Sequence, residues 1–224
     1  METSQVLLVL PWFFDDKDKV YLPTYLPTYP VTPVTVLWDH FQKFSDWYRL
    51  RKSIAWVLRY RSILWSTIKT QEKNGQTKTQ PEKLSLISTE ELENAERAIL
   101  KVVQQTVYRD EINTLNKSSG HPVKRTSSLL KLDPFLRNGL LCVGGRLAQA
   151  RVSTKAEDQI ILPKNSHVSS LVVDHYHKLT GHSGRQHVLS LIRQKYWVVK
   201  ANSTVRKVLT NCYKCRRQEV PFCE

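Results

Sequence analysis

Two histidines and two cysteines near the C-terminal end of the chain could bind a metal ion. His177 and His182 are separated by four residues, Cys212 and Cys215 by two, and 29 residues lie between the pairs. Imidazole nitrogens and thiolate sulfurs are the donors of tetrahedral structural zinc sites. Four protein ligands leave no coordination position for a substrate or an activated water, so the metal would stabilise a fold and perform no chemistry. The sequence therefore predicts one structural zinc ion.

Three nearby patterns offer alternatives to this ligand set. His175 precedes His177 by two residues, and on a helix their side chains point about 200° apart, so only one can face the metal. We expect it to be His177. We expect His187 on the surface or beside the aromatic core, and not at the metal. A redox Cys-x2-Cys motif begins a helix in a βαβ setting, whereas we expect Cys212 and Cys215 to follow the end of a helix.

The chain is strongly basic, and the charge is concentrated near its C-terminus. It has 34 Lys and Arg against 20 Asp and Glu, a net charge of +14 over 224 residues. Residues 160–224 hold 11 of these basic side chains and 3 acidic ones. This excess favours a polyanionic partner, nucleic acid before an anionic membrane surface. The side chains expected to contact phosphates are Arg185, Arg193, Lys195, Lys200, Arg206, Lys207, Arg216 and Arg217.

Cysteine usage and hydropathy indicate the compartment. Four cysteines are too few for a disulfide scaffold in a chain of this length, so we expect an intracellular protein of the nucleus or cytoplasm, with Cys142 and Cys223 as reduced thiols. No apolar run reaches the roughly 18 residues of a membrane span. Residues 6–14 are apolar but are followed by Asp15 and Asp16, unlike a secretory signal peptide. We expect no membrane partner.

The residues around the four ligands predict three short helices. The first covers 167–179, the second 185–195, and the third 203–209, with Ser203 as its cap. Bulky residues at 196–199 should fill the core of so small a unit. Cys212 would follow directly after the third helix.

Two longer amphipathic helices are predicted upstream. Aromatic and aliphatic residues recur at helical spacing from Asp39 to about Lys69, with basic residues between them. The second helix should begin at Ser88, which has capping-box spacing to Glu91, and continue to about Leu115. Between 138 and 163 an Asn138-Gly139 turn, a strand at 140–143 and another at 159–162 form a β region that must pack against a helix.

The predicted fold is therefore mostly α with a small β region. It ends in a zinc-stapled, helix-turn-helix-like bundle of three helices, preceded by a β-hairpin extension and long amphipathic helices. We divide the chain into a Pro- and Tyr-rich arm at 1–37, a Trp-rich helix at 38–69 and a linker at 70–87. A helix with a β extension follows at 88–163, then the zinc-binding unit at 164–217 and a tail at 218–224.

Several motifs together resemble a known family. The zinc-binding unit contains His177-x4-His182-x-Gly184, Leu189-x-x-Ile192-Arg193-x-x-Tyr196-Trp197, Val205-Arg206 and Cys212-x2-Cys215-Arg216-Arg217. Upstream the chain contains Trp47-Tyr-Arg-Leu, Ala55-Trp-Val-Leu-Arg-Tyr, Glu90-Glu-Leu-x-x-Ala95 and residues 104–111, 139–147 and 160–163. The motifs of the zinc-binding unit are similar to the N-terminal His-His-Cys-Cys domain of retroelement integrases, and the upstream segments are similar to polyproteins of BEL/Pao-type long-terminal-repeat retrotransposons. The resemblance covers about residues 38–217.

The resemblance implies a zinc-stabilised module, similar to a helix-turn-helix, that helps an integrase multimerise and hold DNA ends. Family integrases carry out strand transfer in a following core with two Asp and one Glu. Here nine residues follow Cys215, and no acidic residue lies between Asp174 and Glu219. We therefore expect a chain truncated before the catalytic core, with no enzymatic activity and no small-molecule substrate.

Other interpretations of the same residues stay open. The chain could be a protein-interaction or self-associating module with incidental DNA affinity, or a fragment that complements an intact integrase. It could also be a remnant of a retroelement without function. Charge gathered on the second and third helices of the unit would favour DNA binding.

Overall fold

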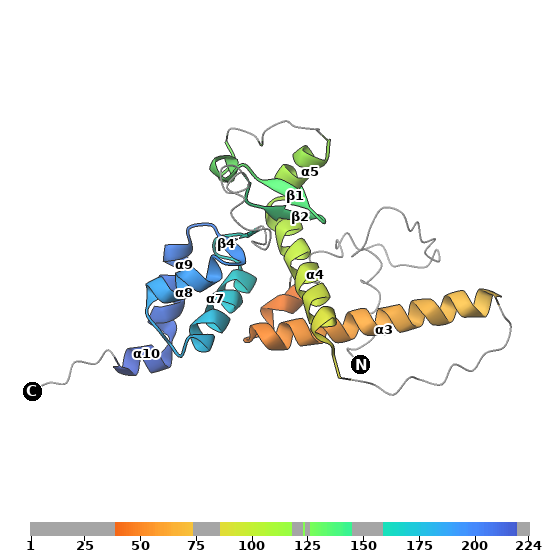
Figure 1. The fold of residues 1–224 in the computed structure, drawn as a ribbon, viewed down its shortest axis with the longest axis horizontal. Helices are drawn as coiled ribbons and strands as arrows, with labels where there is room; N and C mark the ends of the chain where they lie inside the picture. Colours follow the sequence, from red (N-terminus) through yellow and green to blue (C-terminus); the bar gives the residue numbers. More distant parts are fainter. Residues whose placement is uncertain (1–38, 74–85, 118–122, 124–125, 145–158, 219–224) are drawn as a thin grey trace, which may run out of the picture.

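The computed structural model describes residues 39–73, 86–117, 123, 126–144 and 159–218. This part of the chain is mostly helical with a small β region, as predicted, and its strands form one four-stranded sheet (Figure 1). The predicted arm, residues 1–37, lies outside the described residues, as do most of the predicted linker, the tail from 219 onward and Cys223. None of the described helices is long and apolar enough to cross a lipid bilayer.

Helix α3 (Trp47–Lys73) is the Trp-rich helix, but it begins later and ends later than predicted. Residues 39–42 form a separate helical turn. The prediction of one helix from Asp39 is wrong because Asp46 starts a new one, with its Oδ1 accepting a hydrogen bond from the Arg49 backbone N–H at 2.9 Å. The first half of α3 buries Trp47, Leu50 and Ile54.

Helix α4 (Thr89–Val107) begins at the predicted capping box, in which Ser88 Oγ accepts from the Glu91 N–H and the Glu91 carboxylate accepts from the Ser88 N–H. The predicted continuation to Leu115 is interrupted at Tyr108, and α5 (Arg109–Lys117) follows as a separate helix. The non-helical backbone at Tyr108 lets its side chain join a buried cluster with Leu129, Leu141 and Ile161.

Four short strands form one sheet in the order β1-β2-β3-β4. They are β1 (Phe135–Arg137), β2 (Leu140–Cys142), β3 (Ile160–Leu162) and β4 (Tyr196–Val198). The pairs β1–β2 and β2–β3 are antiparallel, and β3–β4 is parallel. The predicted turn is confirmed, since Asn138 and Gly139 both have positive φ, at 52° and 74°, which suits a tight hairpin. Neither β1 nor β4 was expected as a strand.

A buried amide from α4 fills the gap between β2 and β3. These two strands share one registered pair, Cys142 with Ile160. The Gln104 side chain donates to the carbonyls of Leu141 (3.0 Å) and Ile161 (2.7 Å) and accepts from the Leu141 N–H (2.8 Å). Gln104 thus takes the place of a neighbouring peptide group, so α4 is part of the hydrogen bonding of the sheet.

The C-terminal module consists of α7 (His167–Leu179), α8 (Arg185–Ile192), β4, α9 (Ala201–Asn211) and α10 (Tyr213–Gln218). The predicted bounds of α7 are confirmed, whereas α8 ends at Ile192 because the next residues lead into β4. The predicted cap at Ser203 is wrong, since α9 begins after Lys200, whose backbone is left-handed with φ 55°, and Ser203 Oγ donates to the Lys200 carbonyl.

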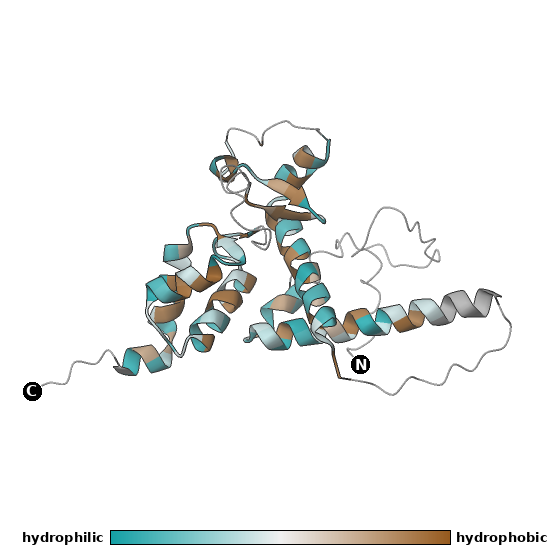
Figure 2. Ribbon diagram, in the orientation of Figure 1, coloured by the Kyte–Doolittle hydropathy of each residue, from teal (hydrophilic) through white to brown (hydrophobic). Residues whose placement is uncertain are grey.

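One large core joins the C-terminal module to the rest of the described chain. Buried residues of α3, α4, the sheet, α7, α8 and α9 form a continuous cluster. Helix α3 packs against both α4 and α7. Hydrophobic residues are spread along the packed helices (Figure 2), and those of the cluster are buried between them. The boundary predicted between residues 163 and 164 lies between β3 and α7, and both the sheet and the core continue across it.

Candidate metal centre

The four predicted ligands meet at one end of the C-terminal module. One donor atom from each of His177, His182, Cys212 and Cys215 lies within 4.8 Å of all the others. His182 Nδ1 is 3.1 Å from His177 Nε2 and 3.3 Å from Cys212 Sγ, and Cys215 Sγ is 3.2 Å from His177 Nε2. A tetrahedral zinc with Zn–N bonds of about 2.0 Å and Zn–S bonds of about 2.3 Å has donor separations of about 3.3–3.8 Å. The donors are therefore positioned to coordinate one zinc ion.

The His-x4-His spacing follows from the way α7 ends. The His182 N–H donates to the His177 carbonyl at 2.9 Å, and the Gly181 N–H donates to the Lys178 carbonyl at 3.1 Å. These are the two hydrogen bonds of a Schellman motif, with Gly181 at the left-handed position after the helix end. The first of these hydrogen bonds joins residues five apart in the sequence, so the two ligand residues are directly linked through their backbones.

Two successive left-handed residues turn the second histidine back toward the first. Gly181 has φ 63° and His182 has φ 65°. A Cβ added at Gly181 would meet no atom within 4 Å, so glycine is favoured there by backbone conformation and not by lack of space. His182 keeps an unfavourable backbone conformation for a non-glycine residue, which zinc coordination would offset.

The cysteines lie at the junction of α9 and α10. The Cys212 N–H donates to the Leu209 carbonyl, and the Cys212 carbonyl accepts from the Arg216 N–H. Cys215 lies in the first turn of α10. The pair was expected only to follow a helix, and it also begins one. The short α10 was not predicted.

The electrostatics of the site favour the forms that bind a metal. Burial, and next the nearby His182, lower the pKa of the His177 imidazole, so it is neutral at neutral pH. Burial acts to raise the pKa of the Cys212 thiol, but hydrogen bonds from the Cys215 backbone and thiol and from the Lys214 backbone outweigh it and lower the pKa overall. Neutral imidazole and thiolate are the ligand forms.

The competing histidines lie away from the donors. His175 packs edge-on against Tyr176, with ring centroids 5.8 Å apart, and is not part of the cluster. His187 is exposed on α8. The choice of His177 over both is confirmed.

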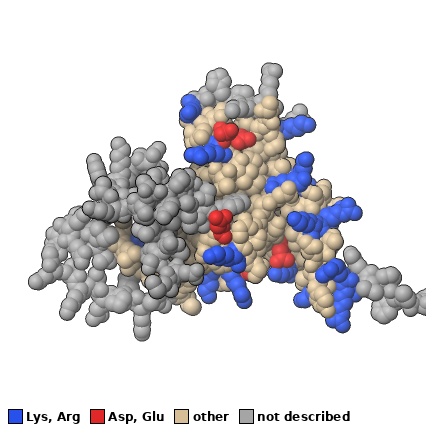
Figure 3. Space-filling view, turned by 180° about the vertical axis from the view of Figure 1, so that it is seen from behind, with Lys and Arg blue, Asp and Glu red and all other residues tan. Residues whose placement is uncertain are grey.

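The predicted phosphate contacts are distributed over α8, α9, α10 and the segment between α8 and α9, which holds Arg193, Lys195 and Lys200. Seven of the eight are exposed, all except Lys195. Asp174 is the single acidic residue in the described range 159–218. Its Oδ2 lies 2.6 Å from Lys178 Nζ. Figure 3 shows Lys and Arg side chains spread along the side where the C-terminal module lies. The exposed basic side chains thus face solvent with little acidic charge beside them.

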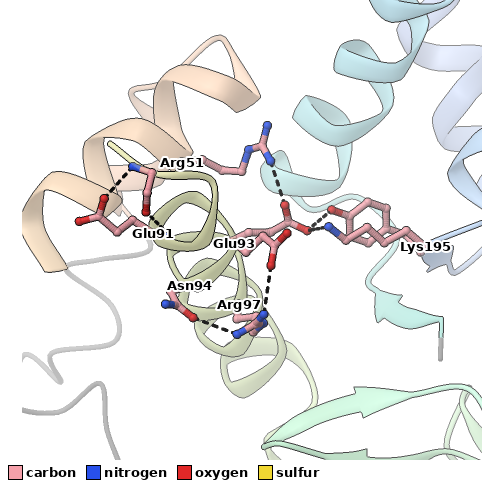
Figure 4. Close-up of polar contacts among 9 residues, drawn as sticks. Arg51, Glu91, Glu93, Asn94, Arg97 and Lys195 are labelled. Atoms are coloured by element: carbon pink, nitrogen blue, oxygen red, sulfur yellow. Dashed lines mark hydrogen bonds and ion pairs between the residues drawn. The ribbon is translucent and has the colours of Figure 1, made fainter. Parts of the chain in front are cut away.

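Lys195, the eighth of these side chains, is partly buried and pairs with an acidic residue. Its Nζ lies 2.6 Å from the Glu96 carboxylate, which also binds Arg51 Nη1 at 3.0 Å and accepts a hydrogen bond from the Tyr196 hydroxyl. We call these four residues the Glu96 cluster. Arg51 and Lys195 approach the same carboxylate from two sides (Figure 4). Glu96 is 2% exposed, so the cluster ties α3, α4 and the C-terminal module together from inside the fold.

Sequence reasoning missed the Glu96 cluster, although one signal was available. Glu96 lies within the apolar stripe of α4, between Ala95 and Ile99, where an acidic side chain would be buried. A buried carboxylate needs a cationic or hydrogen-bonding partner. The sequence does not say which of its many Lys and Arg residues supplies it.

Comparison with known proteins identifies the C-terminal module. Residues 165–221, which are 57 of the 224 residues and include all four ligands, match the family model described as the integrase zinc binding domain. No curated protein and no solved structure matches the chain significantly. The C-terminal module is therefore similar in sequence to the zinc-binding domain of integrases, in which this domain is a non-catalytic region.

Proposed function

We propose that this chain is a non-catalytic module that binds nucleic acid through phosphate contacts. The exposed basic side chains of α8, α9 and α10 would contact the backbone of duplex DNA. In this proposal α7, α8 and α9 act as the zinc-stapled, helix-turn-helix-like bundle, and the metal sets the relative positions of α7, α9 and α10. The activity is binding alone, because a zinc ion with four protein ligands has no open position for a reaction.

The observation that carries the proposal is the large excess of exposed positive charge over negative charge on the C-terminal module. Arg206, Lys207, Arg216 and Arg217 are exposed on the two helices that adjoin the cysteines. Phosphate contacts release condensed counterions, so affinity should fall steeply with salt, with a log–log slope of about −0.9 per contact.

The test is titration of a labelled duplex of mixed sequence with the zinc-loaded chain at several salt concentrations. We expect Arg206→Gln with Lys207→Gln to weaken binding and to reduce the salt slope by about 2. Lys131→Gln, at an exposed position outside the module, is the matched control and should change neither. A strong preference for one DNA sequence would contradict phosphate-dominated binding.

We also propose that the ancestral element is of the BEL/Pao type. The support is the similarity of segments upstream of the zinc module, from the Trp-rich helix to β3, to polyproteins of that lineage. In them these segments join the reverse transcriptase and ribonuclease H part to the integrase. An alignment of the described upstream residues against several retroelement lineages would test the proposal, and a better match to another lineage would overturn it.

A second candidate function, self-association, is favoured by the outer half of α3. Tyr60, Ile63 and Leu64 are each about half exposed there, at 51%, 50% and 48%. Exposed apolar side chains grouped on one helix are a common feature of protein interfaces. Sedimentation of the parent chain and of Leu64→Glu would test this. A monomer at all concentrations would exclude it, and the DNA-binding proposal would be unaffected.

A further inference from the structure

A small cavity in the C-terminal module has the chemistry of a nucleobase site. It lies between the end of α8, the strand β4 and the start of α9, and we call it the β4 pocket. Its volume is about 190 Å³. Pockets for drug-sized ligands hold about 300–1,000 Å³, so this one suits a single ring system and not a whole cofactor. The residues that line it include Leu189, Ile192, Arg193, Trp197, Lys200 and Ala201.

The pocket has an apolar floor and a basic rim. Leu189 and Ile192 are buried beneath it, whereas Arg193, Lys200 and Asn202 are exposed around it. The Arg193 guanidinium carbon lies 6.0 Å from the centroid of the Trp197 ring, so a planar cation and an indole stand together at one wall. Unstacked bases are commonly held on aromatic rings and on arginine guanidinium planes.

The open edge of β4 supplies hydrogen-bonding groups. In the described residues β4 is an edge strand with β3 as its neighbour. The Lys195 carbonyl and the Val199 N–H bond to β3. Because successive residues of a strand direct their backbone groups to opposite sides, Tyr196 and Val198 direct theirs away from β3, toward the side that lines the pocket.

We propose that the β4 pocket binds one unpaired nucleobase, with the backbone of β4 contacting the edge of the base and Arg193 and Lys200 contacting its phosphate. This inference rests on the proposed function and makes it more specific. The chain would bind a DNA end or a distorted duplex, where a base can leave the stack, more tightly than an intact duplex.

The test compares two labelled ligands, a blunt duplex and the same duplex with a short single-stranded end, titrated with the zinc-loaded full chain. Because one base would stack in the pocket, the affinity for the duplex with the single-stranded end should be about fivefold or more above the affinity for the blunt duplex. Ala201→Leu, which fills the pocket without a change of charge, should bring the affinity ratio close to one. Arg193→Gln should reduce the ratio as well.

Arg206→Gln is the matched control, because Arg206 is exposed on α9 but does not line the pocket. It should weaken both ligands equally and leave their ratio unchanged. Zinc content and circular dichroism establish that each variant is folded. Equal affinity of the parent chain for the two ligands, or an unchanged affinity ratio in folded Ala201→Leu, would contradict the proposal that the pocket binds a base. The proposal of duplex binding would be unaffected. Binding of neither ligand would overturn the proposed function as well.

Discussion

The metal centre and the Glu96 cluster both connect distant parts of the chain, but they do so through different kinds of residues. The metal centre joins two short motifs, His-x4-His and Cys-x2-Cys, whose residues have few other reasons to occur together. The Glu96 cluster joins Arg51, Glu96, Lys195 and Tyr196, which are common residue types at separations of 45 to 100 residues.

The two sites also differ in what they stabilise. The zinc ion would hold α7, α9 and α10 together within the C-terminal module, whereas the Glu96 cluster attaches that module to α3 and α4. Binding of structural zinc contributes on the order of 10–16 kcal/mol in isolated zinc fingers. A buried ion pair contributes far less in net terms, although removal of one partner is costly. The module should therefore depend on the metal for its folding and on the cluster for its attachment.

The largest effect is expected from removal of a zinc ligand. Cys212→Ser should lose the metal and the helical structure of the C-terminal module, because the folding free energy of such modules comes mainly from zinc binding. Zinc content and circular dichroism before and after chelation measure this. One zinc per parent chain, lost in the variant together with helix, is the expected result. A C-terminal module that stays folded after zinc is removed would contradict this, because it would show that the hydrophobic core alone stabilises the fold.

Loss of the buried carboxylate should have the next largest effect. Glu96→Gln leaves Arg51 and Lys195 without a counter-charge, and we expect a destabilisation of about 3 kcal/mol, at the low end for buried pairs because both cations are partly exposed. Zinc content should not change. Glu93→Gln is the control, since Glu93 pairs with Arg97 on the surface and should lose less than about 0.5 kcal/mol. Equal shifts in denaturation midpoint for Glu96→Gln and Glu93→Gln would contradict the proposed difference between the buried and the surface carboxylate.

Gln104 provides a neutral counterpart to the Glu96 cluster. Gln104→Met keeps the shape but leaves the backbone groups of Leu141 and Ile161 without their side-chain partner. An unsatisfied buried group costs about 1–3 kcal/mol, and we expect a loss near 2 kcal/mol in chemical denaturation. Gln105→Met, at an exposed position of the same helix, should be close to neutral. If neither substitution changes the free energy of unfolding, the pairing of β2 with β3 does not need the Gln104 amide.

The smallest effect concerns the more exposed ion pair of α3 and α4. Side-chain hydrogen bonds from Arg59, then the Ser88 backbone, lower the pKa of Glu91 from 4.5 to about 2. Because the folded-state pKa is depressed, the pair's contribution to stability is present above pH 4.5 and is lost as pH falls toward 2. An NMR titration should give a Glu91 midpoint near 2 in the parent, and Arg59→Gln should raise it toward 4.5. An unchanged midpoint would show that the backbone cap alone sets it.

Features with a signal inside one short segment were predicted correctly. The bounds of α7, the capping box at Ser88 and Glu91 and the Asn138-Gly139 turn all depend on residues within a few positions of one another. The choice of His177 as a ligand depended on its spacing to His182, which one Schellman motif provides.

The errors occur where tertiary contacts override local pattern. Helical periodicity continues through Tyr108 in the sequence. The helix nevertheless ends there, because the tyrosine side chain is buried in the second core cluster. Residues 196–198 have no strand partner nearby in sequence and become β4 only beside β3. Lys195 is indistinguishable in sequence from the exposed basic residues of the module, and its pairing with Glu96 depends on how α4 packs.

The amino-acid sequence by itself determined the ligand set, the basic character of the C-terminal module and most of its helices, because donor chemistry, net charge and capping are properties of residues and their near neighbours. The tertiary structure decided that the module shares a sheet and a core with α3 and α4, and that Glu96 and Gln104 acquire their roles. Those roles depend on contacts between residues far apart in the chain, which form only when the helices and strands pack together.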